Sequence, residues 1–215
     1  MKLYSEDNSP YCAPVRAAIY AKGLDIPIES PPGGLKSEGY RAISLTGTIP
    51  CLILDDGSPL PESAVIIDYF DDRFPARPLA PVSPEARARM KLVQRIAEGD
   101  LAGPMVQLFH DMAAGDGEAG KARTLARFER GLGLIETLIA DGGYVAGPDL
   151  STADCIFAPA LFGVGFWGPA LGRPSLLADH PRIAAYQARA FAHPAIARVL
   201  DELRSALAQS PINVG

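Results

Sequence analysis

Residues 47–63 carry side chains suited to holding a small charged ligand. Pro50 precedes an apolar run typical of a β-strand, where proline cannot donate a hydrogen bond to a neighbouring strand. A cis bond between Ile49 and Pro50 would expose the backbone of Ile49 at a sharp corner, where a peptide-like ligand could pair with it. Glu62 and Ser63 follow at a predicted helix start, whose free N–H groups could hold the charged end of that ligand.

A second group of reactive side chains, residues 9–12, begins another predicted helix. Ser9 can cap this helix or offer its hydroxyl to a ligand, and Pro10 is pre-set for the first turn. The order Ser-Pro-Tyr-Cys looks like the glutaredoxin Cys-Pro-Tyr-Cys turn with serine in place of its first cysteine. Serine cannot form a mixed disulfide, so the sequence favours a small buried residue at Cys12 over a redox centre.

Composition limits the classes of protein to which this chain can belong. The 215 residues are 48% hydrophobic, which is ample for a packed core. A net charge of −5 argues against a nucleic-acid partner, which needs clustered Lys and Arg. The three cysteines have neither metal-ligand spacing nor an even count for a disulfide framework, so we expect no metal and a reduced, cytoplasmic protein.

One segment could be mistaken for a membrane span. Residues 155–172 carry no charge and reach the length at which a span is considered. They include Pro159, Pro169 and four glycines, and a helix-capping sequence precedes them. We therefore predict a buried helix followed by a loop, and no membrane partner. The acidic start of the chain also lacks the apolar core of a signal peptide.

The elements that must position these residues fall into two patterns. Over residues 1–75 the order is β-α-β-(α)-β-β-α, with strands expected near 2–5 and 26–29, then the hairpin, then a helix over 62–73. Such an order predicts a four-stranded mixed sheet with one parallel βαβ unit and a terminal antiparallel hairpin. Residues 74–84 contain four prolines, which predict a semi-rigid linker at 76–82.

Strand patterns are absent after this linker, and residues 83–215 are expected to form an all-helical domain. Apolar periodicity predicts helices over 83–114, 117–140, 152–165, 181–192 and 194–209, with a weak point at 99–104 in the first. Ser151 and Asp154 are spaced as a capping box that starts the helix at 152. We expect a structural role for Asp154 rather than a catalytic one.

Together these features resemble the glutathione S-transferase superfamily over nearly the whole chain. The segment 3–12, with Ser9 before Pro10, resembles the serine-type active-site turn of the tau and zeta classes. Thr48-Ile49-Pro50 matches the family's cis-proline site, and Glu62-Ser63 lies where the family holds the γ-glutamyl group. Residues 147–154 resemble the capping motif of its sixth helix. The resemblance implies a thioredoxin-like α/β domain followed by the all-α domain.

The resemblance also implies glutathione as co-substrate and assigns roles at the site. Ser9 would donate a hydrogen bond to the glutathione sulfur and stabilise the thiolate, which is the nucleophilic form. Ile49, beside Pro50, would pair with the cysteinyl backbone. Glu62 would bind the α-ammonium and Ser63 the carboxylate of the γ-glutamyl residue. Lys36 is placed like the tau-class lysine that meets the glycyl carboxylate, with Arg41 as its competitor.

A small electrophilic substrate would lie between the two domains. Its pocket residues are expected to include Tyr11, Phe109, His110 and Trp167. Aromatic side chains at helical spacing also serve as core, so a structural role remains open for each of them. Tyr4, Ser5 and Tyr11 are competing hydroxyls for the role given to Ser9.

The sequence favours a glutathione transferase that attacks an electrophilic small molecule with the glutathione thiolate. A zeta-like glutathione-dependent isomerase is the related alternative, although that class has Ser-Ser-Cys where this chain has Ser9-Pro10-Tyr11. A non-catalytic glutathione-binding or regulatory protein of the same fold is a further alternative, because a fold does not determine a function. The resemblance implies a homodimer.

Overall fold

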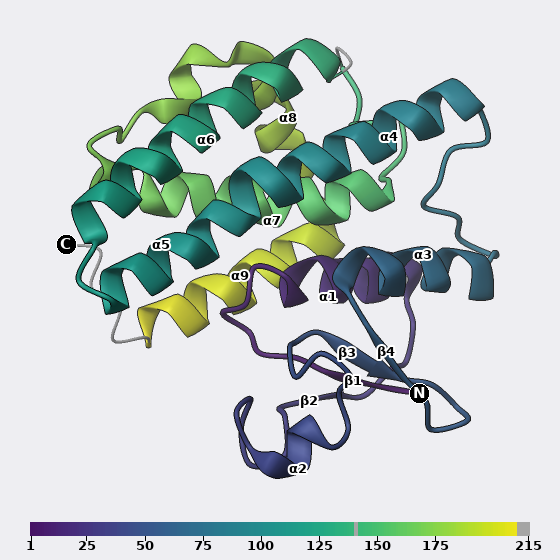
Figure 1. The fold of residues 1–215 in the computed structure, drawn as a ribbon. Helices are drawn as coiled ribbons and strands as arrows, with labels where there is room; N and C mark the ends of the chain where they lie inside the picture. The colour runs from purple at the N-terminus through teal and green to yellow at the C-terminus, as the bar shows by residue number, and fades with distance from the viewer. Residues whose placement is uncertain (140–141, 210–215) are drawn as a thin grey trace.

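The expected four-stranded mixed sheet lies at one end of the molecule, below a stack of helices (Figure 1). A computed structural model describes residues 1–139 and 142–209. The N-terminal α/β domain contains β1 (Lys2–Tyr4), α1 (Cys12–Lys22), β2 (Ile28–Glu29), α2 (Glu38–Arg41), β3 (Cys51–Ile53), β4 (Pro59–Pro61) and α3 (Ser63–Arg73). The strand order is β2-β1-β3-β4, with β1 parallel to β2 and the other pairs antiparallel. The predicted fold class is thereby confirmed for this domain.

The helical domain follows after a proline-rich segment. It contains α4 (Pro84–Ile96), a π-helical turn (Ala97–Ala102), α5 (Gly103–Ala113), α6 (Gly117–Leu138), α7 (Thr152–Trp167), short 3₁₀ turns (Pro169–Leu171 and Leu176–Asp179), α8 (Pro181–Ala192) and α9 (Pro194–Ala208). The predicted helices are therefore present, with ends that differ by a few residues. The weak point expected at 99–104 is the junction of the π-helical turn with α5.

Helix α1 is buried between the sheet and the helical domain (Figure 1). It packs against α3 in its own domain and against α7 and α9 in the other. Every residue from Cys12 to Ile19 is buried, and the alanines Ala13, Ala17 and Ala18 keep the surrounding helices close. This two-sided burial explains why α1 has only a weak amphipathic pattern.

Helix α7 forms the centre of the helical domain and accounts for the uncharged run at 155–172. It packs against α1, α4, α8, α9 and the π-helical turn. Its capping box is formed as predicted: the Asp154 carboxylate accepts from the Ser151 N–H at 2.7 Å and from the Val145 N–H at 2.9 Å. Among the described helices, none is both long and apolar enough to cross a membrane.

A buried ion pair ties the segment between α3 and α4 to the N-terminal domain. Lys22 Nζ lies 2.7 Å from Asp71 Oδ1 and also donates to the Arg77 carbonyl. The Asp71 carboxylate accepts from the N–H groups of Leu79 and Ala80 at 2.6 and 3.0 Å. These bonds fix where the chain enters α4, which forms one wall of the site described below.

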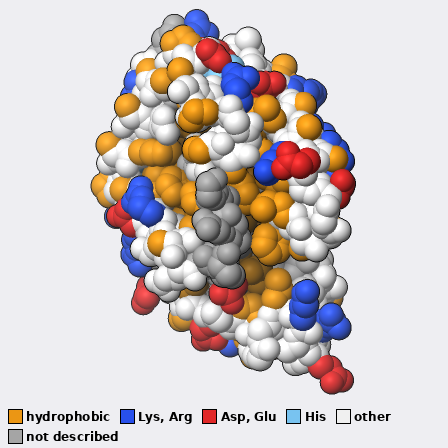
Figure 2. Space-filling model, turned by 90° about the vertical axis from the view of Figure 1, so that its left-hand side faces the viewer, with side chains coloured by type: hydrophobic (Ala, Val, Ile, Leu, Met, Phe, Trp, Pro, Cys, Tyr) orange, Lys and Arg blue, Asp and Glu red, His pale blue; other side chains and the backbone are white. Residues whose placement is uncertain are grey.

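Several charged surface side chains form ion pairs with a neighbour of opposite sign. On the face shown in Figure 2, Lys and Arg side chains often lie beside Asp and Glu side chains, with apolar atoms between them. Lys91 and Asp68, for example, form an exposed ion pair at 2.7 Å that links α4 to α3.

Candidate functional site

Three segments that sequence reasoning selected meet at one end of the sheet. Tyr4 of β1 pairs with Cys51 of β3, and Cys51 pairs with Pro61 of β4. Because both pairings are antiparallel, the C-terminal end of β1, the N-terminal end of β3 and the C-terminal end of β4 lie at the same end of the sheet. Pro50 and Glu62 are therefore neighbours of the turn that follows β1.

A cleft of about 550 Å³ opens at this edge, between the two domains. The N-terminal domain lines it with Ile49, Pro50, Glu62 and Ser63, so four of the predicted binding residues are brought together. Its remaining lining residues are Tyr11, Thr48, Ala64, Val65, Arg95, Glu98, Gly99 and Gly103. Such a volume suits a small ligand rather than a macromolecule.

The backbone before β3 is held open for pairing. The Ile49–Pro50 peptide bond is cis, as predicted. Just before it, the Thr48 carbonyl accepts from the hydroxyls of Tyr40 at 2.7 Å and Ser44 at 3.3 Å. Within the described residues, no hydrogen bond engages the N–H or C=O of Ile49. This edge can therefore pair with an extended ligand backbone.

The start of α3 provides an anion site beside a carboxylate. The first helical bond runs from the Ile66 N–H to the Glu62 carbonyl, so the N–H groups of Ser63, Ala64 and Val65 have no acceptor within the helix. All three residues line the cleft, and their N–H groups and the helix dipole favour an anion there. The exposed Glu62 carboxylate is available for a cation. A ligand end with both an ammonium and a carboxylate fits this pair.

Glu62 adopts an unusual backbone conformation at this point. Its φ is 75°, and among the described residues it is the one non-glycine with positive φ. Such a conformation costs about 1–3 kcal/mol and persists where the surrounding structure imposes it. This backbone conformation sets the Glu62 side chain at the N-terminus of α3.

Ser9 does not line this cleft, although it lies close in sequence to Tyr11, which does. The Ser9 Oγ accepts from the Cys12 N–H at 3.2 Å, and the Ser9 carbonyl accepts from the N–H groups of Cys12 and Ala13. The hydroxyl therefore bonds to the first residue of α1, which begins at Cys12 with Tyr11 as its N-cap, rather than at Ser9 as the sequence suggested. A hydroxyl that accepts one bond can still donate its own proton.

The three cysteines are buried and are poor nucleophiles. Burial raises the pKa of the Cys12 thiol, against the opposing effect of hydrogen bonding with Ser9. Burial likewise raises the pKa values of Cys51 and Cys155. Their thiols therefore stay protonated, which agrees with the core role expected for Cys12.

The helical domain forms the opposite wall of the cleft with residues that sequence reasoning missed. Arg95, Glu98 and Gly99 come from the end of α4 and the π-helical turn, and Gly103 from the start of α5. Burial raises the pKa of Glu98, Arg95 opposes this effect, and Glu62 adds to it. Glu62 and Glu98 therefore face the same space from different domains.

The π-helical turn has a cause that is visible in the sequence. Pro104 has no N–H, and in a regular helix its ring would clash with the carbonyl four residues earlier. The Gly103 N–H instead bonds to the Glu98 carbonyl five residues back, which inserts a wider turn. Pro104, preceded by Gly99 and Gly103, is the sequence signal from which a break in the helix at this wall could have been predicted.

Tyr11 reaches across the cleft from the first domain to this wall. A Cβ atom on Gly103 would lie 3.5 Å from the Tyr11 hydroxyl, which is an ordinary contact distance, so the phenol borders this wall. Burial raises the pKa of Tyr11, and the carboxylates of Glu98 and Glu62 raise it further. Tyr11 therefore remains a protonated hydrogen-bond donor.

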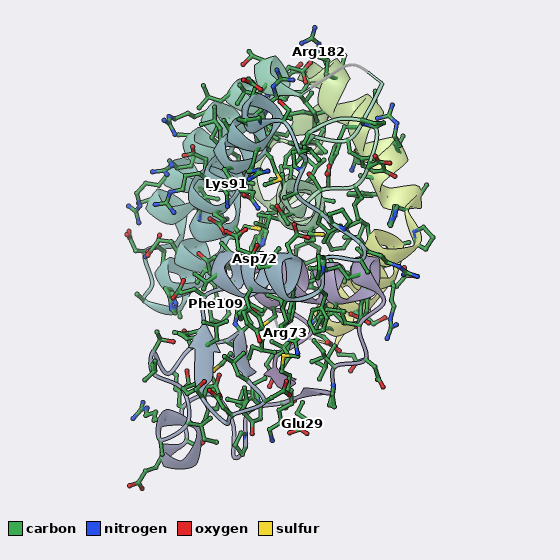
Figure 3. All side chains as sticks on the ribbon, turned by 90° about the vertical axis from the view of Figure 1, so that its right-hand side faces the viewer. Glu29, Asp72, Arg73, Lys91, Phe109 and Arg182 are labelled. Carbon is green, nitrogen blue, oxygen red and sulfur yellow. The ribbon has the colours of Figure 1, made fainter. Side chains whose placement is uncertain are left out.

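The remaining predicted residues lie apart from the cleft lining. Lys36 is exposed before α2, and no ion pair within the described residues involves it. Phe109 and His110 are exposed on α5, with their rings 5.9 Å apart; Figure 3 shows Phe109 at the level where the two domains meet. Trp167 is buried in the core at the end of α7. In the described part of the chain, no three His, Cys, Asp or Glu side chains gather as metal ligands.

Comparison with known proteins gives the same fold and family. The family models for the glutathione S-transferase N-terminal and C-terminal domains match residues 3–78 and 118–189. A maleylacetoacetate isomerase from Pseudomonas aeruginosa is 30% identical, covering 91% of this chain and 93% of its own length. A stringent starvation protein A homolog from Pasteurella multocida is also 30% identical, covering 89% of this chain and 85% of its own.

Solved structures agree with these sequence matches. The maleylacetoacetate isomerase from Methylobacterium extorquens, solved with bound malonate and glutathione, superimposes with a TM-score of 0.79 at 26% identity. The alignment covers 94% of this chain and 97% of that one. A glutathione-bound glutathione S-transferase from Methylobacillus flagellatus gives 0.80 at 23% identity, over 92% and 98% of the two chains, which supports the fold. From its two domains and these relatives, the chain belongs to the glutathione S-transferase family.

Proposed function

We propose that this protein is a glutathione transferase that activates glutathione as a thiolate for attack on an electrophilic small molecule. The observation that carries the proposal is the convergence of Ile49, Glu62 and Ser63 on one cleft, with an unpaired backbone edge beside a helix N-terminus. These groups match the peptide backbone and the zwitterionic γ-glutamyl end of glutathione. The glutathione bound in related structures supports the same ligand.

Ser9 is our candidate for the group that stabilises the thiolate. A free thiol has a pKa of ~8.5, and lowering it by ~2 units requires ~2.7 kcal/mol. One hydrogen bond to a charged group supplies ~1.5–3 kcal/mol, and the N-terminus of α1 adds part of the remainder. Because Ser9 already accepts from Cys12, its proton is directed away from that N–H. Lys36 is our candidate for the glycyl carboxylate, from the tau-class resemblance alone.

The Ser9→Ala variant tests this role. We expect its affinity for glutathione to change less than about threefold, because the other contacts remain. The pKa of the bound thiol, followed by thiolate absorbance against pH, should rise by ~1–2 units, with turnover at neutral pH falling ~10–100-fold. Ser9→Thr keeps a hydroxyl and should retain most of the effect. An unchanged absorbance titration in Ser9→Ala would assign the activation to another group.

An isomerase is a second candidate, favoured by the maleylacetoacetate isomerase relatives. Such an enzyme would add glutathione to a cis-enone, rotate the single bond that results, and expel glutathione unchanged. Isomerisation without net consumption of glutathione, measured with maleylacetoacetate, would favour it over conjugation. The serine-proline-tyrosine order at residues 9–11 differs from the zeta-class Ser-Ser-Cys, so we place this candidate second.

A protein that binds glutathione without turning over an electrophile is the third candidate. Relatives named stringent starvation protein A homologs are as similar as the isomerase. Saturable glutathione binding with no product from aryl halides, epoxides, enones or peroxides would favour it. We also expect a cytoplasmic homodimer from the family resemblance, and light scattering of the purified protein tests the dimer.

A further inference from the structure

One backbone carbonyl of the π-helical turn has no donor along its own helix. The Gly103 N–H bonds to the Glu98 carbonyl, five residues back. At the same spacing, the partner of the Gly99 carbonyl would be the N–H of residue 104, but Pro104 has none. A side chain or water must therefore supply the bond that this carbonyl lacks.

Arg127 supplies the missing donor from a different helix. Helix α6 packs along α4, the π-helical turn and α5 (Figure 1). From there the Arg127 Nη2 atom donates to the Gly99 carbonyl at 2.8 Å. The guanidinium thus takes the place of the N–H that Pro104 lacks.

The same guanidinium also holds the next residue of the turn. Asp100 is 3% exposed, and its carboxylate forms ion pairs with Arg127, whose Nε lies 2.5 Å from Oδ1, and with Arg130. A Cβ atom on Gly131 would lie 2.7 Å from the Asp100 Cβ, so α6 approaches the turn more closely than a larger residue there would allow. A planar, forked guanidinium can engage a carbonyl and a carboxylate at once, which fixes its own orientation.

Arg127 contacts the cleft wall without lining the cleft. Glu98 and Gly99 line the cleft from the helical domain, and Glu62 and Ser63 line it from the N-terminal domain. The Arg127 side chain is not among the lining residues and is half-exposed on α6. A displaced Gly99 would move both lining residues of the turn, because they are consecutive in the chain.

We propose that Arg127 is a positioning residue for the glutathione site. By holding the Gly99 carbonyl, it fixes the π-helical turn relative to the start of α3, where we place the γ-glutamyl end of glutathione. This inference rests on the proposed glutathione binding and adds a residue of α6 to it. A preorganised wall reduces the ordering that binding requires, so the expected effect is on affinity.

Calorimetric titration with glutathione tests this role in three arginine variants. Arg127→Met removes the donor and should raise the dissociation constant ~5-fold or more. Arg130→Met also takes a partner from Asp100 but leaves the Gly99 carbonyl bonded. It should lower the urea midpoint while changing the dissociation constant less than about twofold. Arg123→Met breaks comparable ion pairs one turn earlier on α6 and should likewise leave the dissociation constant within about twofold of the wild-type value.

A Pro104→Ala background isolates the role of the Gly99 carbonyl. Alanine at 104 restores an N–H, so this carbonyl gains a backbone donor: residue 104 if the wider turn remains, or Gly103 if a regular helix forms. Replacing Arg127 by methionine in that background should therefore change the dissociation constant at least ~3-fold less than in the wild type. Should Arg127→Met alone fail to fold, the double variant should fold and bind glutathione as Pro104→Ala does.

Four results with these variants would overturn the role of Arg127. One is an unchanged dissociation constant in Arg127→Met, and another is an equal loss of affinity in Arg127→Met and Arg130→Met. The others are an effect of Arg127→Met that is the same in both backgrounds, and a double variant that does not fold. Absence of glutathione binding to the wild-type protein would instead overturn the proposed function itself, which separates the two conclusions.

Discussion

Glu62 combines backbone strain with a ligand-binding side chain. A positive φ of 75° is unfavourable for any residue with a Cβ atom, and glycine adopts it with little penalty. A glutamate at this position, where glycine would be less strained, fits a residue whose side chain binds a ligand. Strain of this kind is expected where a site is preorganised.

A pair of substitutions separates these two contributions. Glu62→Gly should be about 1 kcal/mol more stable to urea unfolding than Glu62→Ala, because glycine relieves the strain that alanine keeps. Both variants should bind glutathione poorly, because both lack the carboxylate. Equal unfolding free energies in the two variants would show that the backbone at Glu62 is not strained.

Among individual residues, the sequence predicts the cleft lining of the N-terminal domain better than that of the helical domain. The start of β3 and the start of α3 lie at the same end of the sheet. Local sequence pattern is therefore enough to bring together Ile49, Pro50, Glu62 and Ser63. Arg95 of α4 and Glu98 of the π-helical turn come more than thirty residues later, and their approach depends on how the domains pack. The apolar periodicity of the sequence does not show how the two domains pack against each other.

At the element scale, the cap of α7 is expected to be the most sensitive helix end. The Asp154 side chain is fully buried and satisfies the N–H groups of Val145 and Ser151. Asp154→Ala leaves both donors without their partner, and each buried unsatisfied group costs ~1–3 kcal/mol. We expect a loss of ~2–5 kcal/mol in the free energy of unfolding, measured in urea.

The matched control for this prediction is Glu85→Ala. Glu85 lies in the first turn of α4, but it is exposed, and its carboxylate accepts from the Ser83 hydroxyl at 2.6 Å. An exposed contact of this kind contributes below ~0.5 kcal/mol. Similar losses in the two variants would contradict a special role for the cap of α7.

Helix α9 has a pH-sensitive start. The Nδ1 atom of His193 accepts from the Ala195 N–H at 3.3 Å, and burial lowers the pKa of His193. A histidine whose folded-state pKa lies below its unfolded value of ~6.5 contributes stability that is present above that pH. This contribution is lost as the pH falls through the lower folded-state value, because the protonated ring can no longer accept.

Urea midpoints at pH values of about 7.5 and 5.5 test this dependence. The midpoint should fall more on acidification in the wild type than in His193→Asn, which keeps a capping acceptor that does not titrate. His110→Asn, at an exposed position on α5, should behave like the wild type. A His193→Asn variant with the full wild-type pH dependence would show that His193 is not the responsible group.

The π-helical turn marks the limit of element-scale prediction. A weak point at residues 99–104 was visible from glycine and proline content, but its conformation was not. Glycine and proline content indicates that a regular helix is disfavoured, without selecting a break, a kink or a wider turn. Pro104 disfavours a regular helix here, and the wider turn that results packs against α6 and α7.

An ion pair made by the almost fully buried Arg16 links the two domains, and a second buried pair fixes the segment that joins them. Arg16 of α1, which is almost fully buried, donates to the carbonyls of Glu6 and Asp7 and lies 3.0 Å from Glu202 of α9. Lys22 and Asp71 fix the segment that leads into α4. The two contacts secure both the turn before Ser9 and the opposite wall of the cleft.

Breaking one of these pairs should have a large effect on stability. Asp71→Asn leaves the buried Lys22 ammonium without its counter-charge, which costs ~3–5 kcal/mol. Combining it with Lys22→Met should recover part of that loss in urea unfolding. Asp68→Asn breaks an exposed ion pair with Lys91 and should cost below ~1 kcal/mol. Equal costs for Asp71→Asn and Asp68→Asn would contradict the role of the buried pair.

The overall architecture was predictable because its signals are local. Strand-helix alternation, a proline-rich segment and long helical periods each follow from short stretches of sequence, and their order along the chain determines the fold class. The cleft between the domains was not predictable in the same way. It depends on the seating of α1 between α3, α7 and α9, which is a property of packed surfaces rather than of sequence pattern.

Calorimetric titration with two ligands tests whether the cleft holds glutathione by its γ-glutamyl end. Glutathione should bind the wild type saturably, and an analogue that lacks the α-amino group of the γ-glutamyl residue should bind at least ~10-fold more weakly, since a charge-assisted contact contributes ~1.5–3 kcal/mol. In Glu62→Gln the two ligands should bind with nearly equal, reduced affinity, because the partner of the ammonium is gone. Absence of glutathione binding, or undiminished discrimination in Glu62→Gln, would contradict the assignment of this cleft.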